Sequence, residues 1–218
     1  MVPGHIKDIV AVHPDHAVWR SKAITHVAEL DAAMSTPRNG RAPLWAITVH
    51  QPWASLIAIG EKNVENRDWH PPDGMLGNWI AIHAGKSYDR DTWLNAVTMA
   101  KRANAQPDWI RKADTWFEKS RNMTERAGKQ ELKRVLSDAV PYGAIVALAK
   151  IESIVDKDTL TPETQPWFLG TFGWVLSGVT QIEPEACGGQ QGLWPVQGEL
   201  LMRVRDKFKC AVSASQER

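Results

Sequence analysis

Residues 44–84 constrain the fold most, because strand and helix patterns alternate there over very short distances. Leu44–His50 has apolar side chains at every second position, which is typical of a strand with one buried face. Residues 51–59 are long enough for a helix of about two turns, with Pro52 suited to its first position and Gly60 to the residue after its end. Two further short strands are expected at Val64–Trp69 and Trp79–His83.

The rest of the sequence predicts a helical block with more short strands after it. Residues 86–140 have apolar side chains at helical spacing and predict two or three helices, broken near Pro107 and Gly128. Five to seven short strands with inserted helices favour an α+β fold with a small β-barrel over a doubly wound sheet. The later strands are expected at residues 143–155, 172–176, 179–182 and 200–204.

This pattern predicts one elaborated domain with additions at both ends. Residues 1–41 form an N-terminal extension, with helical spacing between Pro14 and Ala33. Residues 42–210 form the barrel domain, with 86–140 as its helical insertion, and 211–218 are expected to be a flexible tail.

Composition and charge indicate a protein of the cytoplasm. The net charge is +1, but residues 86–140 carry 12 Lys or Arg against 8 Asp or Glu, so positive charge is concentrated in the insertion. Either a solvated helical face or a nucleic-acid surface accounts for this excess. Cys187 and Cys210 lack metal-ligand spacing and are too few for a disulfide framework. No apolar run reaches the length of a membrane span or of a signal peptide, so we expect no membrane association.

The turn after the first helix places three charges close together. Lys62 and Arg67 are cations on either side of Glu65. A buried Lys has a lowered pKa and can act as a base, a carboxylate can orient a water, and the planar fork of Arg suits a phosphate or a base edge. The alternative is that Glu65 and Arg67, two apart on a strand, form a structural ion pair. The sequence leaves both interpretations open.

Some of the 11 Trp residues and two His residues are further candidates. Trp53, Trp174 and Trp194 are candidate platforms for stacking a base, although core packing is the commoner role of Trp. His50 and His83 each end an expected strand. Two His without a third ligand make a weak zinc site, so we expect no metal and no cofactor.

Three ordered pieces of this sequence resemble the ASCH family, which belongs to the PUA-like superfamily of small β-barrels. They are Pro52-Trp53-Ala54, Gly60-x-Lys62-x-x-Glu65-x-Arg67 and Ile82-His83-Ala84. Later segments at 142–146, 173–176 and 192–194 are also similar to bacterial and phage members. The resemblance covers about residues 44–205, interrupted by the helical insertion.

This resemblance implies a cleft between the short helix and the strands that binds RNA, another nucleic acid or a nucleoside-type small molecule. An enzymatic alternative is hydrolysis of the amide of N-acetylated cytidine, or ribonuclease activity, with Lys62 as base and Glu65 positioning a water. In the family's amidohydrolases a Thr stands at the position of Glu65, so the hydroxyl of that mechanism is missing here. A third alternative is a protein-interaction module that uses the helices, and the oligomeric state is left open. The expected ligand-binding residues are Trp53, Lys62, Glu65, Arg67, His83 and Trp194.

Overall fold

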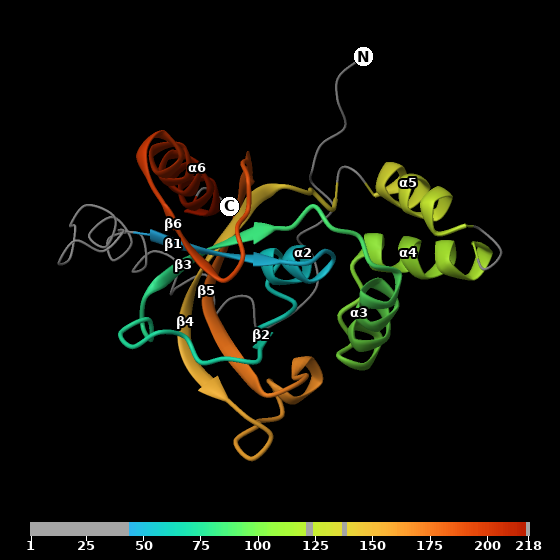
Figure 1. Ribbon diagram of the computed structural model, residues 1–218, viewed down its shortest axis with the longest axis horizontal. Coiled ribbons are helices and arrows are strands. Elements are labelled where there is room, and N and C mark those ends of the chain that lie inside the picture. Colours follow the sequence, from blue (N-terminus) through green and yellow to red (C-terminus); the bar gives the residue numbers. More distant parts are fainter. Residues whose placement is uncertain (1–43, 121–123, 137–138, 217–218) are drawn as a thin grey trace.

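A sheet of six strands runs through the centre of the molecule, with helices on both sides (Figure 1). The computed structural model describes residues 44–216 except 121–123 and 137–138. The helical extension expected over residues 1–41 lies outside the described residues. The strands are β1 (Leu44–Val49), β2 (Val64–Arg67), β3 (Trp79–Ala84), β4 (Ala144–Val155), β5 (Phe172–Ala186) and β6 (Leu193–Val196). The helices are α2 (Trp53–Ala58), α3 (Arg90–Arg102), α4 (Asp108–Lys119), α5 (Glu125–Val135), α6 (Gly198–Gln216) and the 3₁₀ turn η2 (Gln165–Trp167).

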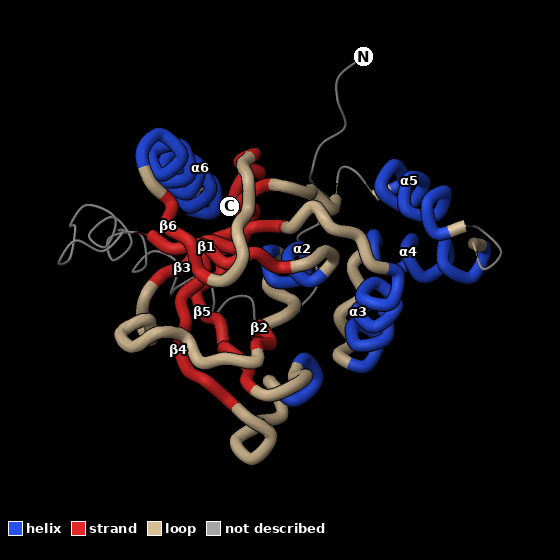
Figure 2. The backbone as a smooth tube through the Cα atoms, viewed as in Figure 1, coloured by secondary structure: helices blue, strands red, loops and turns tan. Residues whose placement is uncertain are grey.

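The strands pair in the order β2-β5-β4-β3-β1-β6, and the fold is mixed α+β as predicted (Figure 2). β1 and β3 are parallel, whereas every other neighbouring pair is antiparallel. β2 and β6 stand at the two edges and do not pair with each other within the described residues, so the closed barrel is not confirmed. The two strands expected at 172–176 and 179–182 are one continuous strand, β5.

The two faces of the central sheet are covered by different helices. Side chains alternate along β3, so Ile80 and Ile82 face α2 whereas Trp79 and Ala81 face α6. α6 packs on its face through three residues spaced four apart, Val204, Phe208 and Val212, all at most 3% exposed.

The C-terminal segment corrects two expectations. Residues 200–204 were expected to be the last strand, but they belong to α6. A run of five residues, four of them apolar, cannot separate strand from helix, and the four-residue spacing that continues to Val212 shows that it is a helix. The tail expected over 211–218 is also wrong where it is described, because α6 continues to Gln216 with Val212 buried. None of the described helices is long and apolar enough to cross a bilayer.

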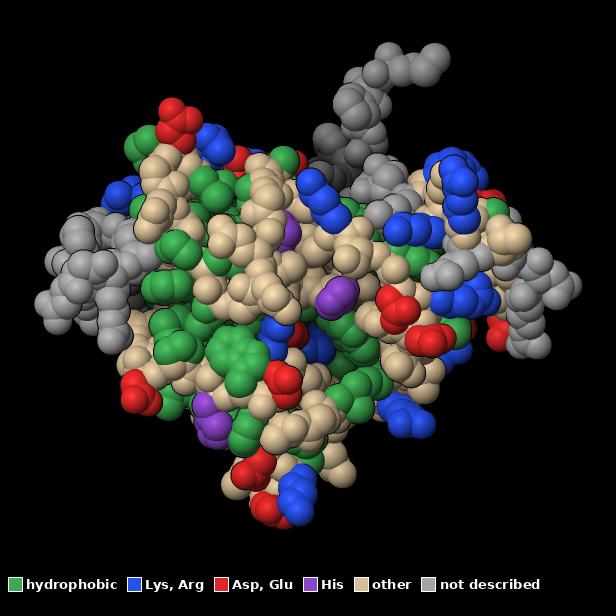
Figure 3. Space-filling view, in the orientation of Figure 1, with side chains coloured by type: hydrophobic (Ala, Val, Ile, Leu, Met, Phe, Trp, Pro, Cys, Tyr) green, Lys and Arg blue, Asp and Glu red, His purple; other side chains and the backbone are tan. Residues whose placement is uncertain are grey.

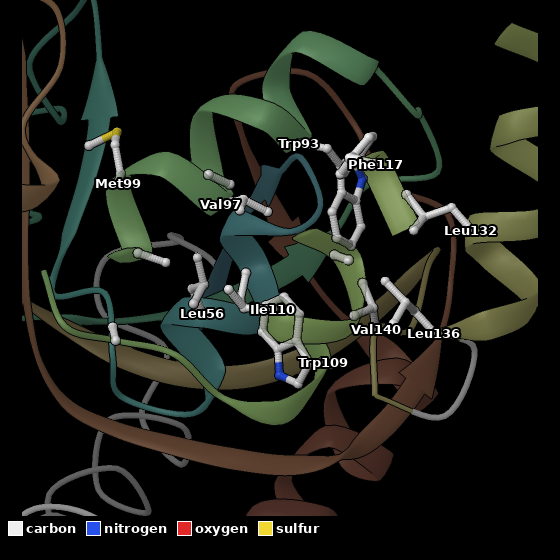
Figure 4. Close-up of a cluster of buried hydrophobic side chains, with 14 of the residues drawn as sticks. Leu56, Trp93, Val97, Met99, Trp109, Ile110, Phe117, Leu132, Leu136 and Val140 are labelled. Carbon is white, nitrogen blue, oxygen red and sulfur yellow. The ribbon is translucent and has the colours of Figure 1, made fainter. Parts of the chain in front are cut away.

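The helical insertion forms a core of its own against the sheet domain (Figure 4). Trp93 of α3 is fully buried and packs against Trp109 and Phe117 of α4, with ring centroids 6.4 Å apart in both pairs. Leu56 of α2 belongs to the same buried cluster, so the insertion is joined to the central fold. Gly128 does not break the helix as expected: it lies inside α5, where an added Cβ would be 3.1 Å from the ring of Trp116.

The insertion leaves and rejoins the sheet at one point. Ala84, the last residue of β3, is the register partner of Ala144, the first residue of β4. Close by, the buried side chain of Gln51 donates a hydrogen bond to the carbonyl of Pro141, and its own oxygen accepts from the backbone N–H of Ser55 in α2. The end of the insertion is thereby tied to the beginning of α2.

Candidate ligand-binding site

A tight turn after α2 places the first charged residue of the motif. The helix begins at Trp53, and Pro52 precedes it as the N-cap after a cis peptide bond, not as the first helical residue. Gly60 follows the C-cap with φ of 79°, a conformation that glycine adopts without strain. The backbone N–H of Lys62 then donates to the carbonyl of Leu56, which turns the chain back beneath the helix.

Lys62 is buried, with only 2% of its surface exposed. Its ammonium donates to the carbonyl of Val64 and lies 3.2 Å from Oε2 of Glu65. Burial lowers the pKa of Lys62, because the charged form loses its hydration; Glu65 acts in the opposite direction and Arg67 adds to the lowering. The ammonium therefore depends on Glu65 to remain charged in this position.

Glu65 lies between the two cations, as the sequence order suggests. Its Oε1 is 3.1 Å from Nη2 of Arg67, and the same Nη2 donates to the carbonyl of Thr48 on β1 at 2.8 Å. The pairing of β1 with β6 ends at Ile47, one residue before Thr48. Arg67 thus joins the edge strand β2 to β1, near the opposite edge of the sheet, by a side-chain contact in place of strand pairing. We call Lys62, Glu65 and Arg67 the charged cluster.

The charged cluster is an ion-pair network that is largely removed from solvent. The exposed fractions of its side chains are 2%, 8% and 20% for Lys62, Glu65 and Arg67. Trp53 is half-buried beside it, with the Lys62 ammonium 5.6 Å from the centre of its ring. Figure 3 shows a hollow over β2 and α2 in which basic and acidic side chains lie between hydrophobic ones.

His83 and Trp194 form a second group, which Thr48 connects to the charged cluster. Trp194 packs edge-to-face on His83, with centroids 5.7 Å apart, and its indole N–H donates to Oγ1 of Thr48 at 3.2 Å. Oγ1 of Thr48 in turn donates to the carbonyl of Gln190. A Cβ at Gly189 would lie 2.3 Å from the His83 ring, so only glycine fits where the chain crosses it.

The structure therefore brings Trp53, Lys62, Glu65 and Arg67 directly together. His83 and Trp194 are connected to them through Thr48. Trp194 is 3% exposed, which makes it a support for His83 and Thr48, and Trp174 is fully buried in the core. The residue that sequence reasoning missed is Thr48. Its only signal in the sequence is a polar side chain in an otherwise apolar strand.

Two buried donor or acceptor atoms at the site lack a partner. Within the described part of the chain, neither Nε of Arg67 nor Nδ1 of His83 makes a hydrogen bond. Buried polar atoms in folded proteins are nearly always paired, so these two are unsatisfied atoms that the protein itself covers. No group of three or more His, Cys, Asp or Glu side chains among the described residues is placed to hold a metal ion, and His50 is exposed after the end of β1.

Burial of His83 makes the stability of the fold depend on pH. Burial lowers the pKa of His83 from its ordinary value of 6.5, Lys86 acts in the same direction, and the Cys187 carbonyl acts against them. Below pH 6.5 the unfolded chain therefore binds a proton that the folded chain resists, so the free energy of unfolding falls as pH falls through this range. We expect His83→Gln to make the melting temperature less dependent on pH between about 7.5 and 5.5. His50→Gln, which removes an exposed imidazole, is the control, and equal pH slopes for His83→Gln and the unaltered chain would contradict the expectation.

The comparisons with known proteins point to one domain family. The family model of the ASCH domain matches residues 47–167, more than half of the 218 residues. Human activating signal cointegrator 1 is 54% identical over 43 residues, which is 19% of this chain and 7% of that protein. The mouse protein of the same name is 53% identical over 38 residues, 17% of this chain and 6% of its own length. A crystal structure of ASCH from Zymomonas mobilis matches with a TM-score of 0.39 and 16% identity, covering 75% of this chain and 94% of that one.

Proposed function

Because this chain belongs to the ASCH domain family, we propose that it binds RNA, or a nucleobase or nucleotide, at the charged cluster and Trp53. The observation that carries the proposal is the geometry of the site. A half-buried indole lies beside a buried ammonium, which shares a single carboxylate with a half-buried guanidinium. A flat apolar surface next to fixed hydrogen-bond donors is what binding of a heterocyclic base requires.

The charge of the cluster favours an anionic or electron-rich ligand. Two cations and one carboxylate leave a net positive charge in a site with little solvent. Nη2 of Arg67 is held by Glu65 and the Thr48 carbonyl, and 20% of the side chain is exposed, so the guanidinium can still donate to a ligand. A phosphate oxygen or the acceptor edge of a base fits that donor, because the guanidinium fork offers its N–H groups in one plane.

A second candidate function is hydrolysis of a modified nucleoside amide or of RNA. The observation that favours it is the lowered pKa of Lys62, which is what a lysine base requires. Two of the three ammonium donors of Lys62 are already engaged, by the carbonyl of Val64 and by Glu65. Those contacts favour the charged form of Lys62, which supports binding ahead of proton abstraction.

The direct test is titration of a fluorescent single-stranded RNA at two salt concentrations. We expect binding that weakens as salt rises, and a loss of about tenfold or more in affinity for Arg67→Ala. Arg67→Lys keeps the charge without the planar fork and should recover only part of that loss. Arg134→Ala, which removes a cation with a side chain 75% exposed on α5, is the matched control.

Two outcomes would count against binding as the function. If Arg67→Ala and the unaltered chain bind RNA with equal affinity, the charged cluster is not the binding site. Turnover of an acylated cytidine or of RNA, abolished by Glu65→Gln, would make the enzyme the better account. A panel of modified nucleosides that raises the melting temperature would identify the class of ligand in either case.

A further inference from the structure

Trp69 is a second half-buried indole close to the charged cluster, just after the end of β2. Its ring meets the buried ring of Trp174 edge-to-face, with centroids 4.8 Å apart and an interplanar angle of 89°. The indole N–H of Trp174 donates to the carbonyl of Trp69 at 3.3 Å. The ring is therefore held by the core and cannot swing freely, which lowers the entropic cost of stacking a ligand on it.

A continuous series of contacts joins Trp69 to Trp53. Trp174 is the register partner of Glu65, so their side chains are neighbours on one face of the β2–β5 pair. Glu65 contacts both cations of the charged cluster, and the ammonium of that cluster lies over the ring of Trp53. Both indoles pack on the rim of the same buried cluster. Figure 3 shows the corresponding arrangement, with hydrophobic side chains on both sides of the hollow that contains the charges.

We propose that Trp69 is a second stacking platform and that the site takes a single-stranded polynucleotide, with one base at Trp53 and a neighbouring base at Trp69. This inference rests on the proposed function and goes further by naming the form of the ligand. Successive bases of a single strand are linked by a phosphate, and Arg67 lies in the chain between the two indoles with 20% of its side chain exposed. A duplex is excluded from this arrangement, because its base faces are covered by their own neighbours in the stack. A free nucleoside fills only one of the two platforms.

The experiment compares the affinities of a single-stranded RNA of about six nucleotides, a mononucleotide and a duplex, all by competition against one fluorescent probe. For Trp69→Leu we expect the single strand to bind about 5- to 100-fold more weakly, whereas the mononucleotide keeps its affinity. Trp69→Phe retains a flat ring and should restore most of the loss. Trp45→Leu is the matched control, because Trp45 is another half-buried indole on the rim of the same cluster.

The outcomes separate this inference from the function it rests on. If Trp69→Leu leaves the single strand unaffected while Arg67→Ala weakens it, the second platform is wrong and the binding site stands. If Trp69→Leu weakens the mononucleotide and the single strand by the same factor, there is one platform and the inference is also overturned. If the unaltered chain binds neither ligand, the proposed function itself fails. A melting curve for each variant shows that a loss of affinity is not a loss of fold.

Discussion

Replacing Glu65 with Gln is expected to lower the free energy of unfolding by about 3–5 kcal/mol, the usual cost of removing one partner of a buried ion pair. The substitution preserves the shape of the side chain but leaves the ammonium of Lys62 buried with no negative charge beside it. Arg67 loses the same partner, and only 20% of its side chain is exposed to solvent. Urea denaturation at neutral pH measures the change.

Two comparisons show whether the buried ammonium is the cause. Glu152→Gln, on the exposed side of β4, should change stability by no more than about 0.5 kcal/mol. The double variant Lys62→Met with Glu65→Gln should recover much of the loss, because the uncompensated cation is gone. A double variant no more stable than Glu65→Gln alone would contradict this explanation.

The effect of Glu65→Gln should also depend on pH. The pKa of Lys62 is already lowered from its ordinary value of 10.5, and loss of the carboxylate removes the largest influence that raises it. Between the lowered pKa and 10.5 the unfolded chain binds more protons than the folded chain, so stability rises with pH across that range. The deficit of the variant should therefore shrink as the solution is made alkaline.

Truncation of Trp93 to Ala is expected to cost about 3–5 kcal/mol, as other Trp-to-Ala changes in well-packed cores do. Trp93 is fully buried and packs against the rings of Trp109 and Phe117 (Figure 4). These rings are rigid and cannot fill the space that the indole leaves, so the substitution creates a cavity. Because Leu56 of α2 belongs to the same cluster, we expect a single unfolding transition at a lower denaturant concentration.

The adjacent residue of the same helix provides the control. Leu94 is 38% exposed, and Leu94→Ala should cost no more than about 1 kcal/mol. A Trp93→Ala protein that unfolds in two separate steps would show that the insertion is an independent unit and not part of the central fold.

Local patterns were enough to predict the parts of the fold that depend on neighbouring residues. The short helix, the left-handed Gly60 and the helical character of the insertion follow from spacing and turn chemistry within a few residues. The charged cluster follows from the same local logic, since all three of its residues lie within six positions of the chain. The ion pair between Glu65 and Arg67 was one of the two interpretations that the sequence left open.

What the sequence did not predict depends on contacts between distant residues. The bond from Arg67 to the Thr48 carbonyl spans 19 positions, and that from Trp194 to the Thr48 hydroxyl spans 146. No local pattern separates a Trp that holds a His in place from one that stacks a ligand. The apolar run at 200–204 was misread for the same reason, because its helical spacing is completed only by Phe208 and Val212.

The pairing of Ala84 with Ala144 means that the helical block is the elaborated tip of an antiparallel hairpin. Chain entropy alone permits such a tip to lengthen or shorten at small cost, because its two ends already meet. Its packing limits such changes, because Leu56, before the motif, and Val64, within it, are buried in the same cluster as the side chains of the insertion. A shorter hairpin at this point would need new apolar cover for those two side chains before the motif could keep its shape.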